Sequence, residues 1–94
     1  MNKKLAVIVL TWNDWKNTIE WCDTLHERAP HSRFYGYKAV AFAHLGELDH
    51  AQKNLKIFQS KRPEIKKLSD YEKVAPTIIK DTLLQGLEMA GLPH

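Results

Sequence analysis

The chain has 94 residues, of which 44% are apolar and 27% charged, with four glycines and four prolines. This length provides one modest hydrophobic core, and the composition excludes a disordered or collagen-like chain. The net charge of +3 is below what a dedicated nucleic-acid-binding domain usually carries. The single cysteine, Cys22, cannot form a disulfide within the chain, so we expect a reducing, cytoplasmic setting.

The first candidate element covers residues 3–12. Its apolar run from Leu5 to Leu10 contains consecutive β-branched residues, so the run alone fits a buried strand as well as a helix. Two lysines precede it, as in a signal peptide, but the run is too short to span a bilayer and no small-residue cleavage pattern follows. We expect a helix, because the segment is in register with a helix 33 residues later.

Three helices are expected next, each with apolar residues at spacings of three and four. The first begins after Asp14, the second follows Ser32 as N-cap and ends at Gly46 as a left-handed cap, and the third ends before Pro63. Their predicted buried stripes are Trp15, Thr18, Cys22 and Leu25; Tyr35, Ala39, Phe42 and Leu45; and Leu48, Ala51, Leu55 and Phe58.

After Pro63 the pattern changes. Residues 64–68 fit a short helical turn, the Ser69–Glu72 spacing predicts a capping box, and Pro76 restarts or kinks the chain. A last apolar stripe comprises Ile79, Leu83, Leu87 and Ala90, and Gly91 and Pro93 then supply a stop. We expect this helix to cap the preceding helices.

A weak repeat underlies these elements. Pro30 and Pro63 lie 33 residues apart and each closes a similar stretch, which divides one domain, residues 1–94, into repeats at about 1–30 and 32–63 and a capping segment at 64–94. The order of Tyr35, Gly46, Ala51, Leu55 and Pro63 resembles the tetratricopeptide repeat (TPR) family. The resemblance implies an all-α superhelix of two helical hairpins plus a C-terminal capping helix. The first repeat departs from the pattern, with Asn13, Thr18 and Cys22 where Gly, Ala and an aromatic residue are usual.

Two more specific resemblances concern the ends of the chain. The ending from Gly86 to Pro93 is similar to that of TPR regions in bacterial nucleotide cyclases and winged-helix regulators. Residues 6–15 resemble the first strand and loop of family 2 glycosyltransferases, but that fold needs a much longer chain and an acidic metal-binding motif that this sequence lacks.

No catalytic or cofactor-binding constellation emerges. The five histidines include no i,i+4 pair and no Cys-x2-Cys accompanies them, so we expect no metal site. Cys22 lies on a buried stripe without a neighbouring base, which disfavours a role as nucleophile. The glycines are isolated from one another, which disfavours a phosphate-binding loop. The basic stretch between Lys53 and Lys67 is interpreted as a solvated face rather than a nucleic-acid site. We therefore expect a chain that is not an enzyme, with no cofactor, nucleic acid or membrane as partner.

The predicted function is protein–protein interaction, as a scaffold or regulatory module. In a TPR-like superhelix the first helix of each hairpin lines a concave face, where an extended or helical peptide with an acidic or carboxylate end would bind. The predicted peptide-binding residues are Lys4, Val7, Thr11, Arg33, Tyr37, Val40 and His44. The alternative is a structural segment of a larger nucleotide cyclase or DNA-binding regulator, without a ligand of its own.

Self-association is a further expectation. The first helix has no preceding repeat to cover its apolar side chains, and an uncovered apolar strip typically marks an interface. We expect a symmetric homodimer through the N-terminal hairpin. The predicted interface residues are Leu5, Ile8 and Trp21.

Overall fold

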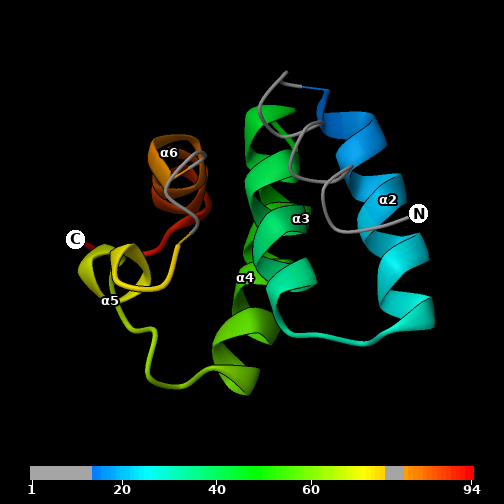
Figure 1. Ribbon diagram of the computed structural model, residues 1–94. Helices are drawn as coiled ribbons and strands as arrows, with labels where there is room; N and C mark the ends of the chain where they lie inside the picture. Colours follow the sequence, from blue (N-terminus) through cyan, green and yellow to red (C-terminus); the bar gives the residue numbers. More distant parts are fainter. Residues whose placement is uncertain (1–13, 76–79) are drawn as a thin grey trace.

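The regular secondary structure of the described part of the chain is all α-helix. The computed structural model describes residues 14–75 and 80–94, and within them it contains no strand. The helices are α2 (Trp15–Arg28), α3 (Arg33–His44), α4 (Leu48–Lys61), α5 (Leu68–Glu72) and α6 (Lys80–Ala90). Successive helices α2, α3 and α4 alternate in direction, and α5 and α6 lie on the other side of α3 from α2 (Figure 1). The predicted helix over residues 3–12, the Pro76 break and the Ile79 contact fall outside the described residues.

Helix α2 begins and packs as its sequence predicts. The carboxylate of Asp14 accepts hydrogen bonds from the backbone N–H of Asn17 at 3.4 Å and from its side-chain amide at 2.6 Å, which caps the first turn. The hydroxyl of Thr18 donates to the Asp14 carbonyl at 3.0 Å, so this polar side chain is satisfied within the core. The predicted stripe is confirmed, since the buried residues of α2 are Trp15, Thr18, Cys22 and Leu25.

Helix α3 is the central element, and its burial differs from the prediction. It packs against α2, α4 and α6. In the predicted stripe only Ala39 is fully buried, while Tyr35, Phe42 and Leu45 are half-buried. Because neighbours cover α3 on several sides, its buried residues are not confined to one stripe; they are Phe34, Gly36, Tyr37, Ala39, Val40, Ala41 and Ala43.

The turn between α3 and α4 follows the predicted glycine cap. Gly46 has a φ of +82°, in the left-handed region where a side chain is disfavoured. The N–H of Glu47 donates to the Phe42 carbonyl at 2.9 Å, and the N–H of Gly46 donates to the Ala43 carbonyl at 3.1 Å. These two bonds form a Schellman motif, which satisfies carbonyls that the helix end would otherwise leave unpaired.

Ser32 lies at the N-cap position of α3, as predicted, but it does not cap the helix through its side chain. Ser32 has helical backbone angles and its side chain makes no capping hydrogen bond. The ring Nδ1 of His31 instead accepts the N–H of Arg33 at 3.1 Å, and the Nδ1 of His26 accepts the N–H of His31, also at 3.1 Å. Two imidazoles thus satisfy backbone donors between α2 and α3.

Helix α4 ends at Lys61, ahead of Pro63, as predicted. Ala51, Leu55 and Phe58 of its predicted stripe are buried, but Leu48 is 47% exposed. Asn54, which is not in the predicted stripe, is also buried, and its side-chain amide donates to the His50 carbonyl at 2.8 Å. The intrahelical bond allows this polar residue to be buried.

The short helix α5 does not use the predicted Ser69–Glu72 capping box. The Asp70 carboxylate accepts from the backbone N–H groups of Lys66 at 3.0 Å and Lys67 at 3.2 Å, so α5 begins at Leu68. The N–H of Leu68 donates to the carbonyl of Pro93 at 2.7 Å. This bond connects the C-terminal segment to the start of α5.

Helix α6 packs closely against α3. Its buried residues are Leu83, Gly86, Leu87 and Ala90, which confirms the described part of the predicted stripe. A Cβ placed on Gly86 would lie 2.9 Å from the Cα of Val40, so glycine permits this approach of the two helices. Gly91, with a φ of +115°, ends the helix as predicted. Across the part of the chain that the structure describes, no helix is long and apolar enough to cross a membrane.

Candidate binding site

The predicted peptide-binding residues of α3 occupy different environments. Tyr37 is 7% exposed and Val40 is completely buried, whereas Arg33 and His44 are half-buried. The prediction of an open apolar floor at Val40 is wrong, because α6 covers this side chain where Gly86 permits close contact. Arg33 and Tyr37 line the same cavity. The other predicted positions of this face, Lys4, Val7 and Thr11, lie outside the described residues.

His44 lies at the opposite end of α3 from Arg33 and contacts α2. Its ring stacks on Trp15 with 4.3 Å between centroids and an interplanar angle of 7°. Its Nε2 atom is buried and makes no hydrogen bond with the described part of the chain. His44 therefore contributes to the α2–α3 contact and is separate from the site at Arg33.

The predicted dimer residues are only partly described. Leu5 and Ile8 lie outside the described residues. Trp21 is half-buried on α2, packs against the hydrophobic core, and lines a shallow depression with Asn17, Glu20 and Thr24. Its contact with a second copy of the chain stays a prediction.

A cavity of about 210 Å³ lies where the start of α3, the end of α4 and α5 meet. The start of α3 and the end of α4 are at the same end of the molecule, at the bottom of Figure 1. We call it the arginine–tyrosine cavity; it is lined by Arg33 and Tyr37 from α3, by Phe58 from α4 with Arg62 just beyond, and by Tyr71 from α5 with Val74 just beyond. His31 borders it as well.

Aromatic packing holds the walls of this cavity. The rings of Phe58 and Tyr71 meet edge to face, with 5.8 Å between centroids and an interplanar angle of 74°. The guanidinium carbon of Arg33 lies 5.1 Å from the centroid of the Phe34 ring, a cation–π arrangement. Because Phe58 is 2% and Tyr71 5% exposed, these walls belong to the core and are firmly positioned.

Charges and phenols converge on the cavity. Burial raises the pKa of Tyr37, and the nearby charge of Arg33 opposes this rise. Burial also raises the pKa of Tyr71, with Tyr37 adding to the rise and Arg62 opposing it. Both phenols are therefore protonated at neutral pH and can donate hydrogen bonds. Arg33, Tyr37, Arg62 and Tyr71 all line this one cavity.

The two arginines are not equivalent. The Nε of Arg62 donates to the carboxylate of Glu64 at 2.6 Å, and this hydrogen bond is the main reason that the pKa of Glu64 is lowered. Arg33 has no carboxylate partner among residues 14–75 and 80–94. The cavity thus carries one unbalanced guanidinium, which favours a ligand with a negative charge.

Of the seven residues that line this cavity, the sequence predicts two as binding residues, Arg33 and Tyr37. Arg33 and Tyr37 were selected for their place on a helix face, whereas Arg62 was interpreted as part of a solvated basic stretch. Tyr71 had no distinguishing signal, because it lies on a five-residue helix that is too short to show periodicity.

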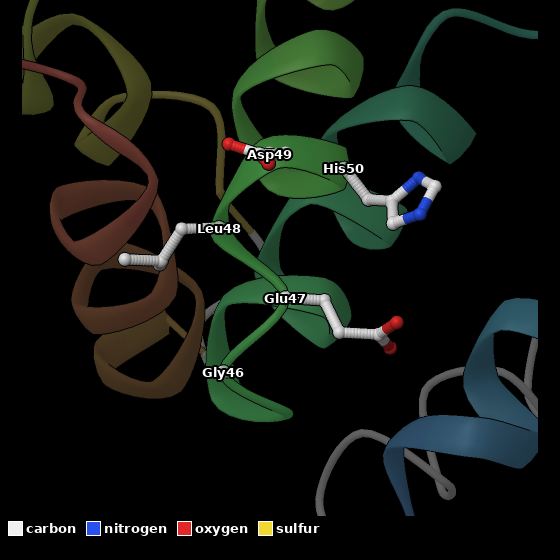
Figure 2. Close-up of a pocket in the computed structure, with 5 residues that line it drawn as sticks. All are labelled: Gly46, Glu47, Leu48, Asp49 and His50. Carbon is white, nitrogen blue, oxygen red and sulfur yellow. The ribbon is translucent and has the colours of Figure 1, made fainter.

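A second depression, at the turn between α3 and α4, lacks converging groups. It involves Gly46, Glu47, Leu48, Asp49 and His50. Figure 2 shows the side chain of Leu48 directed toward α6, while Glu47 and His50 point to the opposite side. His50 stacks instead on Phe42, with 5.0 Å between centroids. We therefore do not assign a ligand to this turn.

Groups that could bind a metal ion are not assembled in the described ranges. Among residues 14–75 and 80–94, no three His, Cys, Asp or Glu side chains come together as metal ligands would. Cys22 is fully buried, as predicted, and burial raises the pKa of its thiol to about 12, although the charge of Lys38 opposes the rise. The protonated thiol is a poor nucleophile.

No family model matches the chain, and no curated protein or solved structure is significantly similar to it. The described residues define an all-α protein with a small cationic, aromatic cavity. The resemblance to TPR proteins stays a prediction.

Proposed function

We propose that the chain is a TPR-like protein-interaction module, without catalytic activity of its own, that binds an acidic segment of a partner protein. The observation that carries this proposal is the unbalanced guanidinium of Arg33, which lines a cavity together with Arg62 and two protonated phenols. A partner carboxylate would receive charge-assisted hydrogen bonds there, and such bonds are stronger than neutral ones.

The helix arrangement supports the interaction role. Helices α3 and α4 form an antiparallel hairpin (Figure 1), and α6 packs mainly against α3 at the end of the chain, as a capping helix would. Binding residues that lie on helices already packed into a core need little ordering when a partner arrives, which reduces the entropic cost of binding.

The chain segment that joins α4 to α5 is also cationic. Lys61, Lys66 and Lys67 are exposed beside it in the sequence, while the Asp70 carboxylate already accepts backbone hydrogen bonds. An excess of one sign of charge attracts an oppositely charged partner over several ångströms and accelerates its association.

The test measures binding of the 94-residue chain to a fluorescent peptide rich in glutamate and leucine. We expect Arg33→Glu to weaken binding by about tenfold or more, because it removes charge-assisted bonds and adds repulsion. The control is Lys53→Glu, which makes the same charge change at an exposed residue in the first half of α4. It should change the affinity by less than about threefold, the range of a surface charge.

The same peptide with glutamine in place of glutamate tests whether binding requires the carboxylates of the peptide. Equal binding of the two peptides, or equal effects of the two substitutions, would contradict the proposal. If the chain binds neither peptide, a structural segment of a larger cyclase or regulator becomes the better interpretation.

A further inference from the structure

The arginine–tyrosine cavity has the size of one small ligand. Its volume is about 210 Å³. Pockets for drug-sized molecules typically measure about 300–1,000 Å³. A nucleotide or a folded peptide segment would not fit, whereas an acid with a short carbon chain or one small ring would.

The walls of the cavity require a ligand with an apolar body. The rings of Phe58, Tyr37 and Tyr71 enclose it on the protein side, and each of these residues is less than one-tenth exposed. Val74, at 54% exposed, is among the few large hydrophobic side chains left in contact with solvent in the described ranges. A ligand that covered Val74 would remove this apolar surface from water, which is favourable.

The polar groups of the cavity match one negative charge. Arg62 is already engaged by Glu64, whereas Arg33 has no carboxylate partner among residues 14–75 and 80–94, so one guanidinium of the cavity is unpaired. A carboxylate carries one charge and fits the planar fork of a guanidinium. A phosphate monoester carries a charge of about −1.5 to −2 at neutral pH. The negative charge that Arg33 does not balance would be poorly stabilised beside aromatic walls.

We propose that the arginine–tyrosine cavity binds a free, small, apolar monocarboxylate, of the size of hexanoate or benzoate. Arg33 holds the carboxylate, the hydroxyls of Tyr37 and Tyr71 donate hydrogen bonds to it, and the carbon body lies against Phe58 and Val74. This ligand site goes beyond partner binding. Because an acid in the cavity and an acidic partner segment would compete for Arg33, the small molecule would also regulate the interaction.

The experiment is an NMR titration of the full chain that follows the ring signals of Tyr37 and Tyr71. The probes are sodium hexanoate and benzoate, with hexanamide and benzamide as neutral controls of the same shape. We expect saturable shifts with the acids and affinities about tenfold or more lower for the amides, because a charge-assisted hydrogen bond is lost. Arg33→Gln should weaken hexanoate to a similar degree and leave hexanamide unchanged.

A matched control substitution is Arg28→Gln, since Arg28 is an exposed arginine at the end of α2 and does not line the cavity. It should leave the hexanoate affinity within about twofold of the unmodified chain, as expected for screened surface charge. Circular dichroism of each variant verifies that it is folded. Tyr71→Phe, which removes one donor and keeps the ring, should weaken hexanoate by a few-fold.

Three further results would overturn the proposal. They are equal binding of acid and amide, tighter binding of inorganic phosphate than of hexanoate, and binding of a short peptide through its terminal carboxylate without binding of the free acids. If the free acids do not bind while binding of the glutamate-rich peptide still depends on Arg33, the ligand site is overturned and the proposed function stands. If the free acids bind and the glutamate-rich peptide does not, the proposed function is overturned and the ligand site stands.

Discussion

The crossing of α6 over α3 provides a sharp test of the packing described above. The substitution is Gly86→Ala, at the position where α6 approaches Val40 most closely. The added Cβ would lie 2.9 Å from the Cα of Val40 and would also overlap its Cγ1 atom. Carbon atoms in contact are normally about 3.5–4.0 Å apart, so the two helices would have to separate by roughly 0.6–1 Å. A main-chain atom cannot rotate out of the way as a side chain can.

Two opposing contributions determine the expected change in stability. Overpacking of a well-packed core typically costs about 1–3 kcal/mol. Replacing glycine by alanine inside a helix increases the free energy of unfolding by about 0.8–1 kcal/mol, because alanine loses less backbone entropy on folding. Since the obstacle is backbone, we expect a cost in the upper part of this range, about 2–3 kcal/mol, and therefore a net loss of about 1–2 kcal/mol. For a domain of this size, that loss lowers Tm by about 4–16 °C.

The assay is thermal and urea unfolding followed by circular dichroism, with Gly36→Ala as the matched control. Gly36 is also a buried glycine inside a helix, but a Cβ there would lie 3.4 Å from the ring of Phe58, an ordinary contact distance. This control should be as stable as the unmodified chain or more stable by up to about 1 kcal/mol. A Gly86→Ala chain as stable as the Gly36→Ala chain would refute the close packing of α6 on α3.

Two other predictions concern buried titratable groups. Cys22 is fully buried, and burial raises the pKa of its thiol to about 12. A thiol reagent at about pH 8 should therefore leave Cys22 unmodified in the folded chain and modify it rapidly in urea. Rapid modification without urea would contradict the burial of this face of α2. The pKa values of Tyr37 and Tyr71 are raised by burial, so their neutral forms contribute stability that is complete below the unfolded pKa of about 10 and is lost as pH rises above it. The urea midpoint should therefore fall at alkaline pH, and Tyr71→Phe should reduce that fall relative to neutral pH; a midpoint with the same alkaline dependence in both chains would show that Tyr71 does not contribute.

Local sequence signals predicted the features that depend on nearby residues. The stripe of α2 is buried as its spacing predicts, because among the described helices α2 packs mainly against α3, and contact on one side produces a clear period. Gly46 and Gly91 end their helices because each adopts a positive φ that only glycine tolerates well. The N-cap at Asp14 was not predicted, although it too is local and involves the first turn of α2 alone.

Tertiary packing decided the features that depend on residues far apart in the sequence. Val40 was predicted to line an open face, but α6 returns to cover it at Gly86, and no local pattern records where a later helix packs. The periodicity of α3 was weak evidence for one buried face, because a helix with neighbours on several sides buries most of its surface.

The arginine–tyrosine cavity shows the same division. The sequence by itself predicted that Arg33 and Tyr37 share one face of α3, because they are about one helical turn apart. Arg62 and Tyr71 join them only because α4 returns antiparallel to α3 and α5 then folds against its end. Binding cavities are formed by contacts of this long-range kind, so helical spacing can select one wall of the site while the opposite wall is determined by the packing of the whole domain.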